Sequence, residues 1–136
     1  MTFWIVVEDD LDIQLVLRAM LETWGIQGLI FSDGLDVLYW LADYQQSDLY
    51  RQRPLLALID IRLPHVSGIQ VAASLRASPL LAGMTIVLMT AHRLTPFQER
   101  EALQLSSADL LIYKPLLPMP QLRAMLENLL RVRTRG

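Results

Sequence analysis

Five polar residues of this chain carry groups that could act together on a phosphoryl group. Glu8 and Asp9, here called the acid pair, directly follow one apolar run, and Asp60 follows another. Thr90 and Lys114 each follow a further apolar run. Clustered carboxylates repel one another unless a cation is present, and Mg²⁺ is the natural partner of carboxylate, carbonyl and water oxygens. A nearby hydroxyl and ammonium would neutralise phosphoryl oxygens, and a carboxylate can accept the group as an aspartyl phosphate.

Each of these residues also has an ordinary structural interpretation. An acid after a strand is often the N-cap of the next helix, and we expect Asp10 or Asp12 to serve in that way. For the acid pair, capping or solvation is as good an interpretation as chemistry. A lone hydroxyl such as that of Thr90 is more often a loop or cap group. Lys114 is more distinctive, because it is the only lysine in a chain that has eleven arginines.

Apolar runs alternate with helical patterns along the chain. Runs of strand length lie at residues 3–7, 28–31, 55–59, 85–89 and 110–113. Helices are expected at about residues 12–24, 34–42, 68–77, 96–106 and 119–131. Residues 44–53 are polar and aperiodic, which predicts the end of the second helix followed by a surface loop.

This order predicts an α/β fold built on a five-stranded parallel sheet, doubly wound with helices on both faces. The length of 136 residues corresponds to one domain spanning residues 1–136. In an open parallel sheet, ligands bind beyond the carboxyl ends of the strands, where the strand order reverses. The polar residues at the strand ends are therefore expected to converge in one crevice.

The composition excludes several classes of protein. Hydrophobic residues make up 53% of the chain, which excludes disorder, and 14 acids against 12 bases leave no broad basic field for nucleic acid. Arg131, Arg133 and Arg135 are too few to change that conclusion. The absence of cysteine excludes disulfides and thiolate sites, and His65 and His92 are too few for a zinc site. With no signal peptide and no membrane span, we expect a soluble, cytoplasmic protein.

Four segments in one order and spacing carry a resemblance to a known family. They are IVVEDD at residues 5–10, LIDIRLP at 58–64 with Ser-Gly at 67–68, VLMTA at 87–91, and YKP at 113–115. Together they resemble the receiver domain of two-component response regulators, and the resemblance covers nearly the whole chain. It implies a flavodoxin-like, receiver-type order of the sheet.

The resemblance assigns a role to each acid of the predicted crevice. It implies that Asp60 is the phosphoacceptor and that Glu8 and Asp9 form the acid pair of a Mg²⁺ site. Asp9 and Asp60 would ligate the cation, and the backbone carbonyl of Arg62 would complete the protein ligands. The implied cofactor is therefore Mg²⁺.

The resemblance also assigns roles around the phosphoryl group, with departures from the family pattern. Thr90 would donate a hydrogen bond to one phosphoryl oxygen, and Lys114, with a cis peptide bond to the following proline, would pair with another. The family usually has an aromatic switch residue three positions before the lysine, but here that position is Leu111, and Tyr113 is offset by two. Ser107 stands where the family commonly has glycine.

The function implied is that of a phosphoacceptor domain, and not of an enzyme with a separate substrate. It would take its phosphoryl group from a sensor histidine kinase or a histidine phosphotransfer protein, and would assist its own phosphorylation and dephosphorylation. The alternative is a phosphorylation-independent interaction module, which Leu111 favours and the complete set of site residues disfavours. An aspartyl phosphatase is disfavoured because Arg62 stands where such enzymes have a second acid. Dinucleotide binding lacks its glycine-rich turn.

An output surface is expected around residues 94–113, by analogy with other receivers. Leu94 and Phe97 would supply apolar contacts for a homodimer there, together with Leu110 and Leu111. The opposing hypothesis is a monomer in which Leu110 and Leu111 are both core residues. Neither nucleic acid nor membrane is an expected partner.

Overall fold

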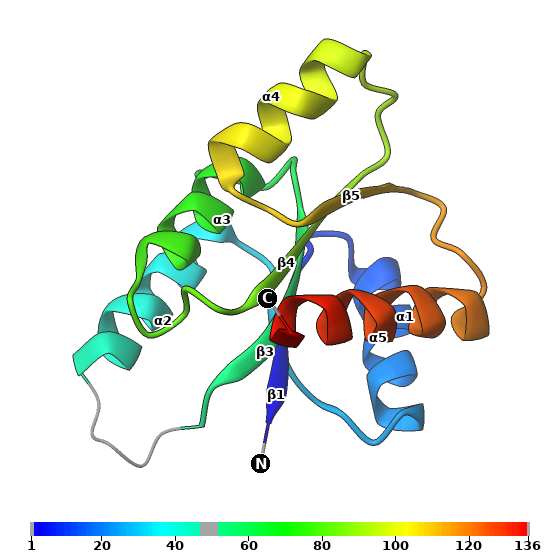
Figure 1. The fold of residues 1–136 in the computed structure, drawn as a ribbon, viewed down its shortest axis with the longest axis horizontal. Helices are drawn as coiled ribbons and strands as arrows, with labels where there is room; N and C mark the ends of the chain where they lie inside the picture. The colour runs from blue at the N-terminus through cyan, green and yellow to red at the C-terminus, as the bar shows by residue number, and fades with distance from the viewer. Residues whose placement is uncertain (1, 47–51, 136) are drawn as a thin grey trace.

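The computed structural model describes residues 2–46 and 52–135, in which helices lie on both sides of one parallel sheet (Figure 1). The strands are β1 (Phe3–Val7), β2 (Gln27–Phe31), β3 (Pro54–Asp60), β4 (Thr85–Thr90) and β5 (Leu110–Tyr113), and the helices are α1 (Leu11–Thr23), α2 (Gly34–Gln46), α3 (Gly68–Ala77), α4 (Pro96–Ser106) and α5 (Met119–Arg135). The order β2-β1-β3-β4-β5 confirms the predicted five-stranded, doubly wound α/β fold. None of the helices in these residues is long and apolar enough to cross a membrane.

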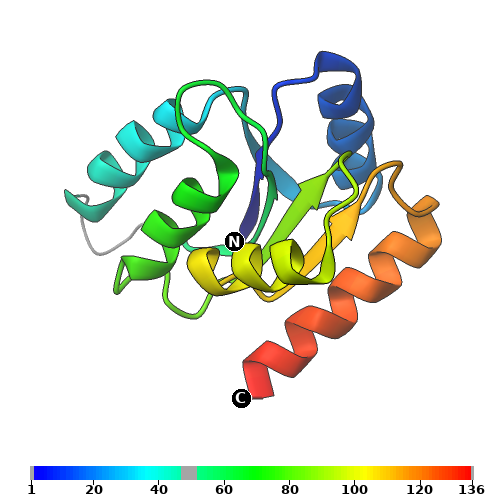
Figure 2. The same cartoon turned by 90° about the horizontal axis from the view of Figure 1, so that it is seen from above.

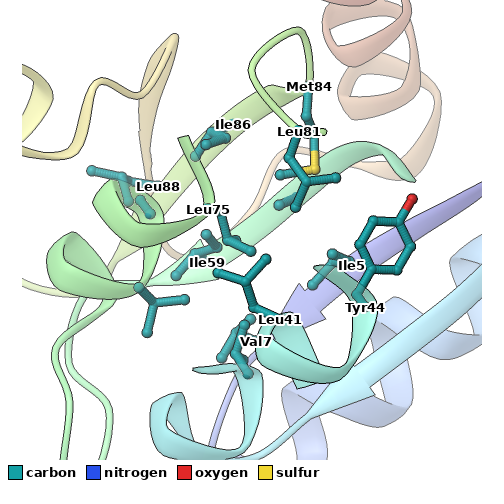
Figure 3. Close-up of a cluster of buried hydrophobic side chains, with 14 of the residues drawn as sticks. Ile5, Val7, Leu41, Tyr44, Ile59, Leu75, Leu81, Met84, Ile86 and Leu88 are labelled. Atoms are coloured by element: carbon teal, nitrogen blue, oxygen red, sulfur yellow. The ribbon is translucent and has the colours of Figure 1, made fainter. Parts of the chain in front are cut away.

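Two apolar clusters hold the helices against the sheet. Helices α1 and α5 cover one face, and α2, α3 and α4 cover the other (Figures 1 and 2). Figure 3 shows the cluster on the second face, where Ile5 and Ile59 of the strands meet Leu41 and Leu75 of the helices. Successive strand residues point to opposite faces, so the neighbouring Trp4 belongs to the cluster on the other side. Because both faces of the sheet are buried, the sequences of the central strands are continuous apolar runs.

Side-chain caps begin the helices that follow the strand ends. Asp10, one of the two expected caps, accepts hydrogen bonds from two backbone N–H groups in the first turn of α1. Ser67 and Thr95 form reciprocal capping boxes with Gln70 and Gln98 at the starts of α3 and α4. Each cap sets the residue at which a helix begins, and it therefore sets the length of the loop between that helix and the strand before it.

Several boundaries differ from the prediction: β2 begins one residue earlier, β4 ends one residue later, and α1 begins and ends one residue earlier. The differences in β3 and α5 have a clear physical reason. Strand β3 extends through Asp60, which pairs with Met89, because hydrogen bonding to β4 continues past the apolar run. Helix α5 extends to Arg135 instead of ending near residue 131. Its last turns are held by Arg133, which bonds to Asp109 at 2.5 Å, a contact across 24 positions that local sequence cannot indicate. Helix α2 ends at Gln46, and the rest of the expected loop falls partly on residues 47–51, outside the described residues.

Gly68 allows α3 to begin against the end of β3. A Cβ atom at this position would lie 2.0 Å from the Asp60 carbonyl oxygen and 2.9 Å from Ile61 Cα. The Gly68 amide also donates to the Ile61 carbonyl at 2.8 Å. A side chain here would therefore have to displace the backbone that carries Asp60.

Gly68→Ala is expected to lower the free energy of unfolding by roughly 2 kcal/mol, because backbone atoms must move to admit the methyl group. Urea denaturation followed by circular dichroism measures the change. Gly83→Ala is the matched control, since no atom lies within 4 Å of its added Cβ, and it should change stability by less than about 0.5 kcal/mol. Equal effects of the two substitutions would contradict this account of Gly68.

Candidate functional site

The carboxyl ends of β1 and β3 bring three acids together, on either side of the point where the strand order reverses. Glu8 and Asp9 directly follow β1, and Asp60 is the last residue of β3. One carboxylate oxygen from each of the three lies within 4.8 Å of the others. Glu8 has no exposed surface and Asp60 is 6% exposed, while Asp9 is an exposed residue. The expected convergence of the acids is thus present in the structure.

Lys114 supplies the positive charge between two of these carboxylates. Its Nζ donates to Glu8 Oε1 and lies 3.4 Å from Asp60 Oδ2. The Lys114 amide also donates to the carbonyl of Thr90 at 2.9 Å, which holds the residue after β5 against the end of β4. The peptide bond from Lys114 to Pro115 is cis, as the resemblance implied. The single lysine of the chain is therefore the partner of two acids, one buried and one nearly so.

Burial and hydrogen bonding shift two pKa values in this cluster. Burial raises the pKa of Glu8 above its usual value, and hydrogen bonds from Lys114 and from the Asp10 amide offset only part of that effect. Burial alone would lower the pKa of Lys114, but its hydrogen bond to Glu8 and the charge of Asp60 outweigh burial and raise it. Lys114 therefore stays charged at neutral pH, where it stabilises the neighbouring carboxylates.

Thr90 and Arg62 lie at or just beyond the carboxyl ends of β4 and β3. Thr90, the last residue of β4, is 1% exposed, and its Oγ1 accepts a hydrogen bond from the His92 amide at 3.1 Å. The His92 side chain itself is exposed. Arg62 is also exposed, two residues beyond the end of β3. The role of the Arg62 carbonyl as a ligand remains a prediction.

Tyr113 connects β5 to the loop and helix that follow Thr90. Its hydroxyl donates to Glu99 Oε1 of α4 at 2.5 Å and accepts from the Leu94 amide at 3.3 Å. The hydrogen bond to Glu99 raises the pKa of Tyr113 above its usual value. The Arg93 guanidinium lies over the ring, 5.2 Å from its centre. Tyr113 is thus an aromatic residue in contact with α4, although it is not at the position where the family has its switch.

Leu110 and Leu111 are both half-buried and pack on opposite faces of β5. Leu110 joins the cluster under α1 and α5, and Leu111 joins the one under α2, α3 and α4. In this respect the opposing hypothesis, that both are core residues, is supported. Phe97, by contrast, is 64% exposed on α4.

Two polar contacts at the carboxyl edge of the sheet were not predicted from the sequence. His65, with a left-handed φ of 66°, bonds through Nδ1 to Asp33 Oδ2 at 2.6 Å, although 32 positions separate them. Gln14 is buried beside Glu8, and its amide donates to the Glu8 carbonyl. A glutamine within the apolar stripe of the first helix was a signal that could have identified the second contact.

The fold and its side chains define a flavodoxin-like α/β protein with a cluster of three acids and one lysine at the strand ends. The sequence matches the response regulator receiver domain family over residues 4–127, and the chain belongs to that family. Members of the family receive the signal from histidine kinases or phosphotransfer proteins, and the receiver is a phosphoacceptor domain and not a classical enzyme.

Relatives and solved structures agree with this assignment. A curated relative, the cyclic di-GMP phosphodiesterase response regulator RpfG of Xanthomonas campestris, is 30% identical over 131 residues, which are 95% of this chain and 32% of the relative. The chain thus spans about a third of that relative's length. The receiver domain of a signal transduction histidine kinase from Syntrophus aciditrophicus is 25% identical, with a TM-score of 0.76 over 98% of this chain and 92% of its own. A CheY-like receiver domain protein from Methanospirillum hungatei (24% identity, TM-score 0.75, 100% and 99% coverage) shares the fold.

Lys114→Met is expected to lower the free energy of unfolding by roughly 3 kcal/mol at pH 7 in metal-free buffer, because it leaves Glu8 buried without its countercharge. A carboxyl group whose pKa is higher in the folded than in the unfolded chain loses stability as pH rises. The pKa of Glu8 is already raised and should rise further without Lys114. The deficit of the variant should therefore shrink as pH falls from about 7 toward 5.

Urea denaturation of wild type and variant at several pH values measures this deficit. Arg100→Met, which removes an exposed cation from α4, is the control and should cost less than about 0.5 kcal/mol at every pH. A Lys114→Met deficit that does not change with pH would contradict the electrostatic explanation.

Proposed function

We propose that this chain accepts a phosphoryl group on Asp60 from the phosphohistidine of a sensor histidine kinase or a histidine phosphotransfer protein, in a Mg²⁺-dependent reaction. The observation that carries the proposal is the grouping of three carboxylates, within 4.8 Å of one another, with the only lysine of the chain, 3.4 Å from Asp60. Membership of the receiver family supports it independently.

The donor set suits a hard divalent cation, because every candidate ligand atom is an oxygen. Glu8, Asp9 and Asp60 would hold Mg²⁺, together with the backbone carbonyl of Arg62. When bound, the cation neutralises negative charge on the transferred phosphoryl oxygens. The three carboxylates repel one another, and a bound cation would offset this repulsion.

Asp60 is the proposed nucleophile. One of its carboxylate oxygens forms a bond to phosphorus while the bond from phosphorus to the donor's imidazole nitrogen breaks, and the imidazole leaves with that electron pair. Lys114 pairs with one phosphoryl oxygen. Thr90 donates its hydroxyl hydrogen to another, since the bond from His92 occupies only a lone pair of Oγ1. In dephosphorylation, water attacks the phosphorus and Asp60 is the leaving group.

Asp60→Asn is expected to abolish labelling of the protein by acetyl phosphate and Mg²⁺, because an amide oxygen is a poor nucleophile. The wild type should form an adduct that base and hydroxylamine remove, as measured by intact-protein mass spectrometry. Asp36→Asn, an exposed acid in the first turn of α2, is the matched control and should label as the wild type does. Unchanged labelling of Asp60→Asn would refute the assignment of the phosphoacceptor.

Mg²⁺ without any phosphodonor is expected to stabilise the folded chain, by about 2.7 kcal/mol at a hundredfold excess over the dissociation constant. Thermal melting at increasing millimolar Mg²⁺ measures the shift. Asp9→Asn should reduce it, whereas Arg62→Ala should retain it because only the carbonyl of that residue serves the cation. Identical melting curves with and without Mg²⁺ would count against the site.

A phosphorylation-independent interaction module is the second candidate function, because Leu111 stands in place of the family's aromatic switch and packs into the core. Under the leading proposal, Tyr113 offers another connection from the Thr90 loop to α4, through Leu94 and Glu99. Binding of a partner that responds neither to beryllofluoride nor to Asp60→Asn would favour the second candidate.

The proposed output surface comprises residues 94–113, and a second copy of the chain is its proposed partner. Phe97 and Leu105 are 64% and 60% exposed on α4, where they would supply apolar contacts. The loop before α4 bonds to Thr90 through His92, and its Leu94 amide bonds to Tyr113. Phosphorylation would thus reach the surface through hydrogen bonds that begin at the site.

Sedimentation velocity should detect a dimer of the wild type that beryllofluoride strengthens, and Phe97→Glu should weaken self-association at least about tenfold, because a charge would be buried in the interface. Tyr39→Glu on α2 is the matched control, since Tyr39 is a similarly exposed aromatic residue (66%) on another helix. A monomer with and without beryllofluoride, in both wild type and Phe97→Glu, would refute the dimer.

A further inference from the structure

Gln14 is a buried polar side chain on the core-facing side of α1. It lies in line with Leu17 and Leu21, and 8% of its surface is exposed. A buried amide costs free energy unless its donors and acceptor find partners. Gln14 has no part in the proposed phosphoryl transfer, yet its amide is buried among leucines.

The side-chain amide of Gln14 joins two segments just beyond the ends of β1 and β2. Its Nε2 donates to the carbonyl oxygen of Glu8, and to Oγ of Ser32 at 2.8 Å. Each acceptor lies one residue past its strand. The Glu8 amide still bonds to the Phe31 carbonyl of β2 at 3.0 Å. The Gln14 side chain therefore connects these two segments just beyond the last residues of the paired strands.

The carbonyl that Gln14 holds belongs to the peptide that joins Glu8 to Asp9. Because a peptide group is planar, fixing its oxygen fixes the direction in which the chain reaches Asp9. Beyond Asp9, the Asp10 carbonyl accepts the first helical hydrogen bond of α1, from the Gln14 backbone amide at 3.0 Å, so the chain is held on both sides of Asp9. The Asp9 carboxylate is exposed, and within the described residues no hydrogen bond or ion pair orients it. The direction of the Asp9 carboxylate therefore depends on the backbone conformation of residues 8–10.

We propose that Gln14 is a positioning residue for the divalent-cation site: it holds the peptide between Glu8 and Asp9 so that the Asp9 carboxylate faces Asp60. The inference rests on the proposed Mg²⁺ site. Without the amide, the loop gains freedom, and repulsion from Asp60 turns the Asp9 carboxylate toward solvent. The cation then has to order the loop as it binds, which weakens its affinity.

Calorimetric titration of the full chain with Mg²⁺ tests the proposal. Gln14→Met keeps the length and apolar stem of the side chain and removes the donor, so affinity should fall about tenfold. Ser32→Ala is the matched control, because it removes the other acceptor of the same amide and leaves the bond to Glu8, so affinity should stay within about twofold. A purely structural role would lower the melting temperature of the metal-free chain and leave the Mg²⁺ affinity unchanged.

The possible results separate this inference from the proposed function. Equal Mg²⁺ affinities of wild type and Gln14→Met would overturn the positioning role alone. A wild type that binds no Mg²⁺ would overturn both the site and the role. An equal loss in Ser32→Ala would assign the effect to the loop after β2 and overturn the role of the Glu8 bond. If Gln14→Met does not fold, Gln14→Asn replaces it, since its shorter amide falls short of the Glu8 carbonyl.

Discussion

The Glu8 carboxylate is enclosed by protein, with none of its surface exposed, and it depends on Lys114 for a countercharge. Leaving a carboxylate buried without a partner costs several kcal/mol, so the ends of β1 and β5 must be held in one arrangement. The parallel sheet meets this requirement because the carboxyl ends of its strands lie at one edge. The two apolar clusters hold the sheet, and through it the distances among Glu8, Asp60 and Lys114.

Polar contacts link the loops around this edge to one another. Gln14 joins the segments after β1 and β2, and the pair of Asp33 and His65 joins the loops after β2 and β3. Beyond β4, the hydroxyl of Tyr113 holds the loop that begins at Thr90 and the first turn of α4. Each contact joins loops that lie at the carboxyl edge of the sheet, where the acids meet.

The opposite edge of the sheet carries a cluster with the reverse balance of charge. Asp109 lies between Arg76 and Arg133, with Arg76 at 3.0 Å and Arg133 at 2.5 Å. It also accepts a hydrogen bond from the Ile86 amide at 2.8 Å. Here two cations surround one acid, which leaves no excess negative charge to attract a metal ion. This edge fastens α3 and α5 to the sheet, while the carboxyl edge keeps its excess of acids.

The order of the elements and the meeting of Glu8, Asp9 and Asp60 at one edge of the sheet followed from the sequence alone. Apolar periodicity and caps such as Thr95 depend on contacts within one or two turns, so α4 and β5 were predicted with their observed ends. Only the tertiary structure decided the contacts that span many positions. Lys114 meets Glu8 across 106 positions, and His65 meets Asp33 across 32. Such pairs depend on the order of the strands in the sheet and on the conformation of the segments beyond their ends, which no local pattern encodes.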